Sequence, residues 1–181
     1  TYTLFYIMTV YSMTYSTAAV PNGLGFSRNS VLWMLMMAVI GFGVMVPIAG
    51  MLADAFGRRK SMIVITSLIL LFALFMFQPL LGSGNQGLVM VFLLVGLSLM
   101  GLTFGPMGAL LPELFPTEVR YTGASFSYNV ASILGASVAP WIAAWLQTTY
   151  GLFWVGVYLA SMAVITLIAL ICTHETKHQS L

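Results

Sequence analysis

A short motif near the C-terminal end of the 181-residue sequence has the residue types and spacing of a zinc hydrolase site. His174, Glu175 and His178 match H-E-x-x-H, in which two histidines one helical turn apart bind zinc and the glutamate serves as general base. The sequence has 2 histidines in all, so it offers no third histidine ligand, and the motif lies in the tail at 174–181. We therefore expect no metal and no cofactor, and a zinc protease stays a remote alternative.

The single cysteine and the sparse charges exclude other chemistries. Cys172 has no partner for an intramolecular disulfide or a cysteine-based metal cluster. The formal net charge is +2, from 6 basic and 4 acidic residues, which is too little for a nucleic-acid interface. We expect the partners of this chain to be lipids and small solutes.

The composition indicates that the elements carrying these residues lie in a lipid bilayer. Hydrophobic residues make up 60% of the sequence, charged residues 6%, and the mean hydropathy is +1.01, whereas a soluble domain is about 25% charged. A bilayer-crossing helix needs about 20 mainly apolar residues, and turn-forming and charged residues divide the sequence into six such runs. The predicted spans are approximately 1–20, 31–53, 61–81, 87–111, 123–147 and 152–173. We therefore predict an all-α membrane protein with six transmembrane helices.

The basic residues are concentrated in alternate loops. One set of loops, with the tail, holds Arg58, Arg59, Lys60, Arg120 and Lys177, whereas the other set holds Arg28. Because basic loops stay on the cytoplasmic side, we expect the first set and both ends of the six-span chain in the cytoplasm. The sequence starts at Thr1 with an apolar run and no basic region before it, so we expect part of a longer protein rather than a signal peptide.

The loop between the second and third spans combines glycines with charges of both signs. In the segment GMLADAFGRRK, Gly50 and Gly57 permit close helix approach and a tight turn, and Asp54 can pair with an arginine of the next helix. Three basic residues alone would serve as an anchor on the cytoplasmic side. The full spacing, G-x-x-x-D-x-x-G-R-R-K, closely resembles the signature loop of the major facilitator superfamily.

Two further segments carry the same resemblance. PELFPTEVRYTG, which contains Glu113, Glu118 and Arg120, is similar to the loop between helices ten and eleven of the sugar porters and of the bacterial metabolite/proton symporters. ETK at 175–177 resembles their tail motif, and His174, where sugar porters usually have proline, favours the symporter group. The order and spacing match the C-terminal half of the family over residues 1–181. The resemblance therefore implies half of a 12-helix bundle, which needs an N-terminal six-helix half as its partner.

This resemblance implies secondary active transport in a bacterial inner membrane rather than enzymatic activity. The substrate would be a small polar or anionic metabolite, moved by alternating access and coupled to protons in the full-length protein. The cytoplasmic charges would form a network that closes the inward side. Its members would be Arg58 or Arg59 paired with Glu113, Arg120 paired with Glu175, Asp54 at the helix end, and Glu118. Exposed pairs contribute about 0–1 kcal/mol each, and a difference of ~1.4 kcal/mol shifts a two-state equilibrium tenfold.

One face of the fifth predicted span is the main candidate for the solute pathway. At about 100° per residue, Ser125, Tyr128, Asn129 and Ser132 project into a narrow arc. Polar side chains at membrane depth face neighbouring helices or a wet cavity. The same residues would also suit a helix-packing seam, and both interpretations stay open.

The first and fourth spans supply further candidates. Tyr11 and Tyr15 lie on one helical face and are possible pathway residues, as is Thr103. Gly105, Pro106 and Gly108 predict a weakened, bent helix, which is either a hinge or a static kink that permits close packing.

The middle of each predicted span lacks ionisable residues. If the complete protein couples solute to protons, the proton acceptor is therefore expected in the other half. An autonomous six-helix channel or receptor stays an alternative to a transporter half.

Overall fold

Helices account for all the regular structure in the computed structural model, which describes residues 1–172. Within these residues there is no β-strand, so the predicted all-α class is confirmed. The α-helices and the π-helical turns, marked η, are α1 (Tyr2–Tyr6), η1 (Ile7–Tyr11), α2 (Ser12–Thr17), α3 (Arg28–Phe56), α4 (Arg58–Phe75), η2 (Phe77–Leu81), α5 (Gln86–Glu113), α6 (Arg120–Ile133), η3 (Leu134–Val138), α7 (Ala139–Tyr150) and α8 (Leu152–Cys172). The first three elements form one uninterrupted stretch, and so do α6, η3 and α7.

Four helical stretches are long and apolar enough to cross a bilayer, namely α3, α5, the stretch from α6 through α7, and α8. The other two predicted spans differ for physical reasons. The stretch from α1 through α2 covers only residues 2–17, and α4 opens with three basic residues, which leaves 61–75 as its apolar part. Length and composition thus support four of the six predicted spans among the described residues.

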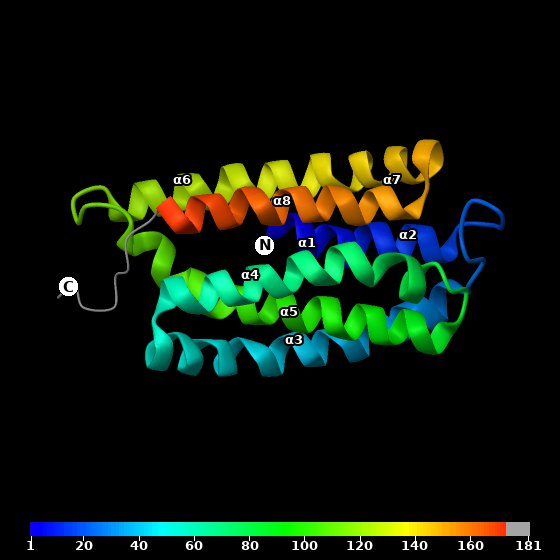
Figure 1. The fold of residues 1–181 in the computed structure, drawn as a ribbon, viewed down its shortest axis with the longest axis horizontal. Helices are drawn as coiled ribbons and strands as arrows, with labels where there is room; N and C mark the ends of the chain where they lie inside the picture. Colours follow the sequence, from blue (N-terminus) through cyan, green and yellow to red (C-terminus); the bar gives the residue numbers. More distant parts are fainter. Residues whose placement is uncertain (173–181) are drawn as a thin grey trace.

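The helices run side by side along the long axis, and their connections gather at two ends (Figure 1). The α3–α4 turn, the 114–119 loop and the end of α8 lie at one end, which we call the basic end because Arg58, Arg59, Lys60 and Arg120 begin helices there. The 18–27 loop, the 82–85 turn and the turn at Gly151 lie at the opposite end. Alternate connections therefore share an end, as the charge pattern predicts.

Glycines allow α3 and α5 to pack closely. A side-chain carbon at Gly101 would lie 2.5 Å from the Phe42 carbonyl oxygen, and one at Gly105 would lie 2.6 Å from the Val46 carbonyl oxygen. Neither separation leaves room for a carbon atom beside an oxygen, so both positions require glycine. The small residues of α5 thus bring two long helices into backbone contact.

The segment around Pro106 does not interrupt α5. The helix is continuous from Gln86 to Glu113, and Pro106 is fully buried. Gly105 packs against α3, whereas nothing lies within 4 Å of the place a side chain at Gly108 would begin. The irregular turns occur instead in η1, η2 and η3, which the sequence analysis did not anticipate. Close packing against α3 therefore accounts for glycine at position 105.

The hydrophobic core has two separate parts. In the larger part, Phe72, Phe77 and Phe92 pack with ring centroids 4.9–6.1 Å apart, and each is at most 4% exposed. A smaller cluster near the basic end consists of Met62, Leu110 and Leu170. The opposite end and the middle of the bundle therefore hold most of the buried apolar surface.

Candidate functional site

The turn between α3 and α4 is built around Gly57. Its φ of 102° lies in a region that side chains disfavour, so glycine suits this position. Its N–H donates a hydrogen bond to the Ala53 carbonyl oxygen at 2.9 Å, which closes α3. Nothing among the described residues approaches within 4 Å of the place a side chain at Gly50 would begin, although the Gly50 backbone nitrogen lies 3.1 Å from the place one at Gly105 of α5 would begin.

Arg58, the first residue of α4, connects neighbouring helices through two carboxylates. Its guanidinium forms an ion pair with Glu113 at the end of α5 and a longer pair, 4.0 Å, with Asp54 of α3. The Arg58 and Glu113 side chains are 26% and 15% exposed, whereas that of Asp54 is 76% exposed. Because water weakens exposed pairs, the Glu113 pair is the stronger of the two.

Arg59 binds the end of α8. Its Nε donates to the Leu170 carbonyl oxygen at 2.8 Å, and its Nη2 donates to that of Ile171 at 2.7 Å. Carbonyls in the last turn of a helix lack partners within that helix, and a cation there also offsets the negative end of the helix dipole. Arg58 and Arg59 thus join the start of α4 to α3, α5 and α8.

The second expected ion pair, between Arg120 and Glu175, includes a residue outside the described part of the chain. Arg120 begins α6, and its Nε is buried without a hydrogen-bond partner among residues 1–172. Glu175 and the H-E-x-x-H motif lie outside these residues. Glu118 is exposed in the loop before α6. Among residues 1–172 no group of three His, Cys, Asp or Glu side chains is placed to hold a metal ion.

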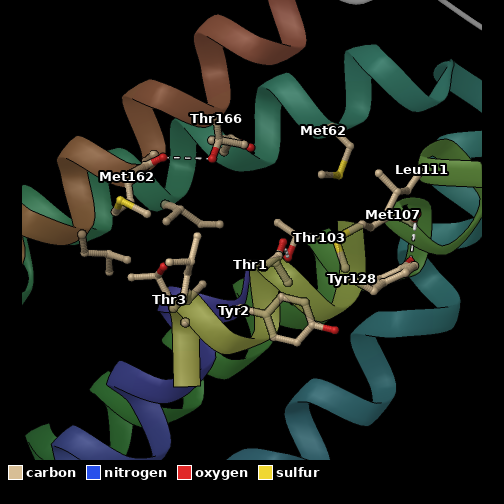
Figure 2. A pocket seen from close by; sticks show the side chains of 18 of the residues that line it. Thr1, Tyr2, Thr3, Met62, Thr103, Met107, Leu111, Tyr128, Met162 and Thr166 are labelled. Carbon is tan, nitrogen blue, oxygen red and sulfur yellow. Dashed lines mark hydrogen bonds between the residues drawn. The ribbon is translucent and has the colours of Figure 1, made fainter. Parts of the chain in front are cut away.

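A cavity of about 400 Å³ lies inside the bundle, between α1, α4, α5, α6 and α8 (Figure 2). Thr103 and Tyr128, two of the predicted pathway residues, line it. The Tyr128 hydroxyl donates to the Met107 carbonyl oxygen at 3.4 Å, and the Thr1 hydroxyl donates to the Thr103 side-chain hydroxyl, also at 3.4 Å. Further hydroxyl residues that were not among the predicted site residues also line this cavity, namely Thr1, Tyr2, Thr3, Thr66, Ser127 and Thr166.

Three of the hydroxyl groups in the cavity wall are bonded within their own helices. Those of Thr103, Ser127 and Thr166 each donate to a carbonyl three or four residues earlier, at 2.8–2.9 Å. Such isolated hydroxyls in apolar helices follow no periodic pattern, so no sequence signal distinguishes them from ordinary helix residues. The wall therefore presents mostly apolar surface.

Tyr11 and Tyr15 border a different cavity, of about 90 Å³. Their rings stack with centroids 6.0 Å apart and an interplanar angle of 14°. Tyr11 is 3% exposed, and its hydroxyl has no hydrogen-bond partner within residues 1–172. Beside them, the Gln147 amide donates to the Asn22 carbonyl oxygen at 3.1 Å. These tyrosines therefore do not share a cavity with Thr103 and Tyr128.

Ser125 and Asn129 lie on the outer face of α6. Both are exposed and border an open hollow, and the Asn129 amide donates to the Ser125 carbonyl oxygen at 2.8 Å. Ser132 is half-buried. The polar arc predicted for the fifth span therefore divides, because Tyr128 lines the central cavity while Ser125 and Asn129 face outward.

The predicted site residues thus lie in separate regions of the bundle, which present different functional groups. The basic end offers ion pairs and charge-assisted hydrogen bonds that link helix ends and can exchange for water. The central cavity offers a mainly apolar wall, and the face of α6 offers an amide and a hydroxyl. The arrangement suits reversible contacts between helices.

Comparison with known proteins reveals transporters along the whole chain. The family model described as Major Facilitator Superfamily matches residues 2–180. The chain is 83% identical over 181 residues to the inner membrane metabolite transport protein YhjE of Escherichia coli (strain K12), a match covering 100% of this chain and 41% of that protein. It is 46% identical over 190 residues to a putative metabolite transport protein of Haemophilus influenzae, covering 100% of this chain and 43% of that one. The glycine betaine/proline/ectoine/pipecolic acid transporter OusA of Dickeya dadantii is 32% identical over 170 residues, covering 93% of this chain and 34% of that protein.

No solved structure was found to match the chain. The three relatives are named as transport proteins and none as an enzyme, and the chain spans less than half the length of each. The family model covers nearly every residue, including the GMLADAFGRRK loop whose spacing first indicated this family. The chain therefore belongs to the major facilitator superfamily.

Proposed function

We propose that this chain is the C-terminal six-helix half of a secondary transporter, which moves a small polar or anionic metabolite across the bacterial inner membrane by alternating access. The observation that carries the proposal is the attachment of α4 at the basic end, through Arg58 to Glu113 and through Arg59 to the last carbonyls of α8. These polar contacts join helix ends and can break and re-form. A gate between two conformations requires contacts of this kind.

The proposal adds two membrane crossings to the four that length and composition support, which gives six in all. The stretch from α1 through α2 and the stretch from α4 through η2 both run alongside the longer helices (Figure 1). The three basic residues that open α4 lie at the basic end, where a membrane surface would solvate them. The N-terminal six-helix half would come from the additional length that the relatives possess.

The basic end is proposed to face the cytoplasm. Five of the six basic residues belong to the loops and tail assigned to that side, and Arg28 alone belongs to the other set. Because basic loops are retained in the cytoplasm, this asymmetry also places both ends of the chain there. The ion pairs of Arg58 then close the cytoplasmic side, so they stabilise the outward-open state.

The Arg58–Glu113 pair is strong enough to bias such an equilibrium. Both side chains are largely shielded from water, and a hydrogen bond to a charged group contributes roughly 1.5–3 kcal/mol. A change of about 1.4 kcal/mol alters an equilibrium constant tenfold. If the pair forms only when the cytoplasmic side is closed, its loss shifts the population toward the inward-open state.

The solute pathway is proposed to follow the outer face of α6. Ser125 and Asn129 are exposed there in this chain, and polar groups at membrane depth are kept away from acyl chains. In the complete transporter this face would therefore border the other half and a wet passage between the halves. Tyr11 and Tyr15 are proposed to lie along the same passage, nearer the opposite end.

The proposed substrate class follows from the relatives and from the loop motifs. One relative is named as a transporter of glycine betaine, proline, ectoine and pipecolic acid, which are small and polar. The resemblance of PELFPTEVRYTG to metabolite/proton symporters supports coupling to protons. Because the predicted spans of this chain lack ionisable residues in their middle, the proton acceptor would lie in the other half.

Substitution of Glu113 in the full-length protein tests the gate. We expect Glu113→Gln to raise the labelling rate of a Ser125→Cys reporter by a water-soluble maleimide about tenfold, when the reagent reaches the cytoplasmic face of inside-out vesicles. The background carries Cys172→Ser, so that the exposed native thiol does not react. Uptake of betaines and organic acids, measured in parallel, should fall because the outward-open state is depopulated.

Glu118→Gln provides the matched control, since Glu118 is exposed in the neighbouring loop. It removes the same charge from the same end and should leave both the labelling rate and uptake unchanged. Equal labelling rates in the Glu113→Gln variant and its parent would contradict the gate.

A further inference from the structure

The tryptophans of this chain lie toward the end of the bundle opposite the basic end. Trp33 is in the second turn of α3, and Trp154 is in the first turn of α8. Trp141 and Trp145 belong to α7, which leads to the α7–α8 turn at the same end (Figure 1). These are all 4 tryptophans of the sequence. Because indole rings favour the boundary between lipid and water, they mark the level of the lipid headgroups at this end.

The α7–α8 turn brings three aromatic rings together, those of Trp145, Tyr150 and Trp154, which we call the exposed ring cluster. The Trp145 and Tyr150 ring centroids lie 5.7 Å apart at an interplanar angle of 79°. The Tyr150 and Trp154 centroids lie 5.9 Å apart at 53°. The turn is tight because Gly151, with a φ of 98°, lies between the two helices. The rings therefore stand at steep angles to one another.

The exposed ring cluster presents ring faces without fixed charge. Its three side chains are each about half exposed, at 47–58%. The sequence from 134 to 172 contains no Asp, Glu, Lys or Arg, so α7 and α8 contribute no charged side chain beside the rings. An aromatic face attracts a cation that lies within about 6 Å of the ring centroid. An ammonium group is therefore the chemistry that this surface fits.

The exposed face of α8 continues from the ring cluster toward the basic end. Ser161, Ile165 and Ile168 are exposed and share one helical face, at spacings of four and three residues. Trp154 lies seven residues before Ser161, on the same face, whereas Leu159 on another face is buried. A mainly apolar helix face of this kind suits lipid acyl chains. Rings at the headgroup level and an apolar face beside them together match the layout of a phospholipid.

We propose that the exposed ring cluster binds the ammonium headgroup of a phospholipid whose acyl chains lie along the exposed face of α8. The bound headgroup holds the α7–α8 turn at the membrane surface. Because the proposed function places the basic end in the cytoplasm, the lipid belongs to the outer leaflet. Only this choice of leaflet rests on the proposed function, and lipid binding is measured without any transport assay.

Lipid binding to the purified full-length protein tests the proposal. Native mass spectrometry gives the apparent Kd of phosphatidylethanolamine, phosphatidylcholine and phosphatidylglycerol with identical acyl chains. The first two lipids carry an ammonium group, and we expect each to bind the parent about fivefold more tightly than phosphatidylglycerol. Tyr150→Leu and Trp154→Leu each remove one ring, and each should weaken binding of the ammonium lipids by about two- to fivefold. Binding of phosphatidylglycerol should not change.

Trp33→Leu is the matched control, since Trp33 is an exposed tryptophan at the same end but lies on α3, outside the ring cluster. It should keep the parent's preference for ammonium lipids. Tyr150→Phe keeps the ring and removes the hydroxyl, so it should also bind like the parent, and weaker binding would replace the ring face with the hydroxyl as the recognising group.

Two results would overturn the proposal. The first is a parent that binds phosphatidylglycerol as tightly as the ammonium lipids. The second is a folded Tyr150→Leu or Trp154→Leu variant that keeps the parent's preference, which would mean that lipid headgroups do not reach the rings. Thermal unfolding identifies the folded variants, and either one suffices if the other does not fold.

Discussion

The two ends of the bundle are held together by different interactions. At the basic end, Arg58 and Arg59 connect helix termini through an ion pair and through hydrogen bonds to carbonyls, and the apolar cluster there is small. Toward the opposite end, Phe72, Phe77 and Phe92 form a buried aromatic cluster within the main core. Polar contacts therefore dominate one end and apolar packing dominates the other.

This difference separates stability from conformational change. A buried aromatic cluster loses its contacts when helices separate, and water offers no equivalent partner. The ion pair and the charged hydrogen bonds at the basic end can be replaced by hydrogen bonds to water, at a cost of roughly 1.5–3 kcal/mol for each bond to a charged group. We therefore expect the opposite end to stay packed in every state, while the contacts at the basic end change between states.

Phe92→Ala should produce the largest effect on stability. Phe92 is 0% exposed and contacts two other rings, and truncation of a buried phenylalanine costs about 3–5 kcal/mol. Thermal unfolding of the full-length protein in detergent measures the loss. Phe75→Ala, on a side chain of α4 that is 64% exposed, is the control and should unfold close to the parent temperature. Similar decreases in unfolding temperature in both variants would show that the aromatic cluster does not contribute more to stability than an exposed side chain.

Gly105→Ala should have an intermediate effect, because it acts on the α3–α5 seam that links the two ends. The added methyl would lie 2.6 Å from the Val46 carbonyl oxygen, and overpacking of this kind costs about 1–3 kcal/mol. Gly108→Ala meets open space and should be neutral or stabilising by up to ~1 kcal/mol, since alanine favours a helix. Thermal unfolding of the two variants checks this order. The reverse order would mean that α3 and α5 are not in close contact in the complete protein.

Features with a strong local cause were predictable from the sequence. Long apolar runs predicted the helices, and the turn at Gly57 follows from a glycine between two charged helix ends. The alternation of basic loops predicted which connections share an end (Figure 1). The spacing around Asp54 and Arg58 indicated the family, which the comparisons established.

Features that depend on tertiary contacts were not predictable in the same way. Helical periodicity grouped Tyr128 with Ser125 and Asn129, yet neighbouring helices determine which edge of that arc faces inward. Gly105 and Gly108 look equivalent in sequence, and only the position of α3 distinguishes them. The pairing of Arg58 with Glu113 and the binding of Arg59 to the last carbonyls of α8 depend on where α5 and α8 end, which the spacing of the two arginines does not indicate.

Arg59→Gln should have the smallest effect on the balance between the closed and open cytoplasmic side. It tests the basic end separately from the Arg58–Glu113 pair. Glutamine keeps a donor but removes the charge that offsets the end of α8, an interaction of about 0.3–1 kcal/mol near a helix terminus. If the contact belongs to the closed cytoplasmic side, labelling of Ser125→Cys should rise by about two- to fivefold. Lys60→Gln removes the neighbouring exposed charge and should change nothing. Because salt screens exposed charges, the difference between Arg59→Gln and its parent should shrink at high ionic strength. If Arg59→Gln instead lowered the unfolding temperature as much as Phe92→Ala, Arg59 would be needed for folding. The claim that the basic end changes while the opposite end provides stability would then be wrong.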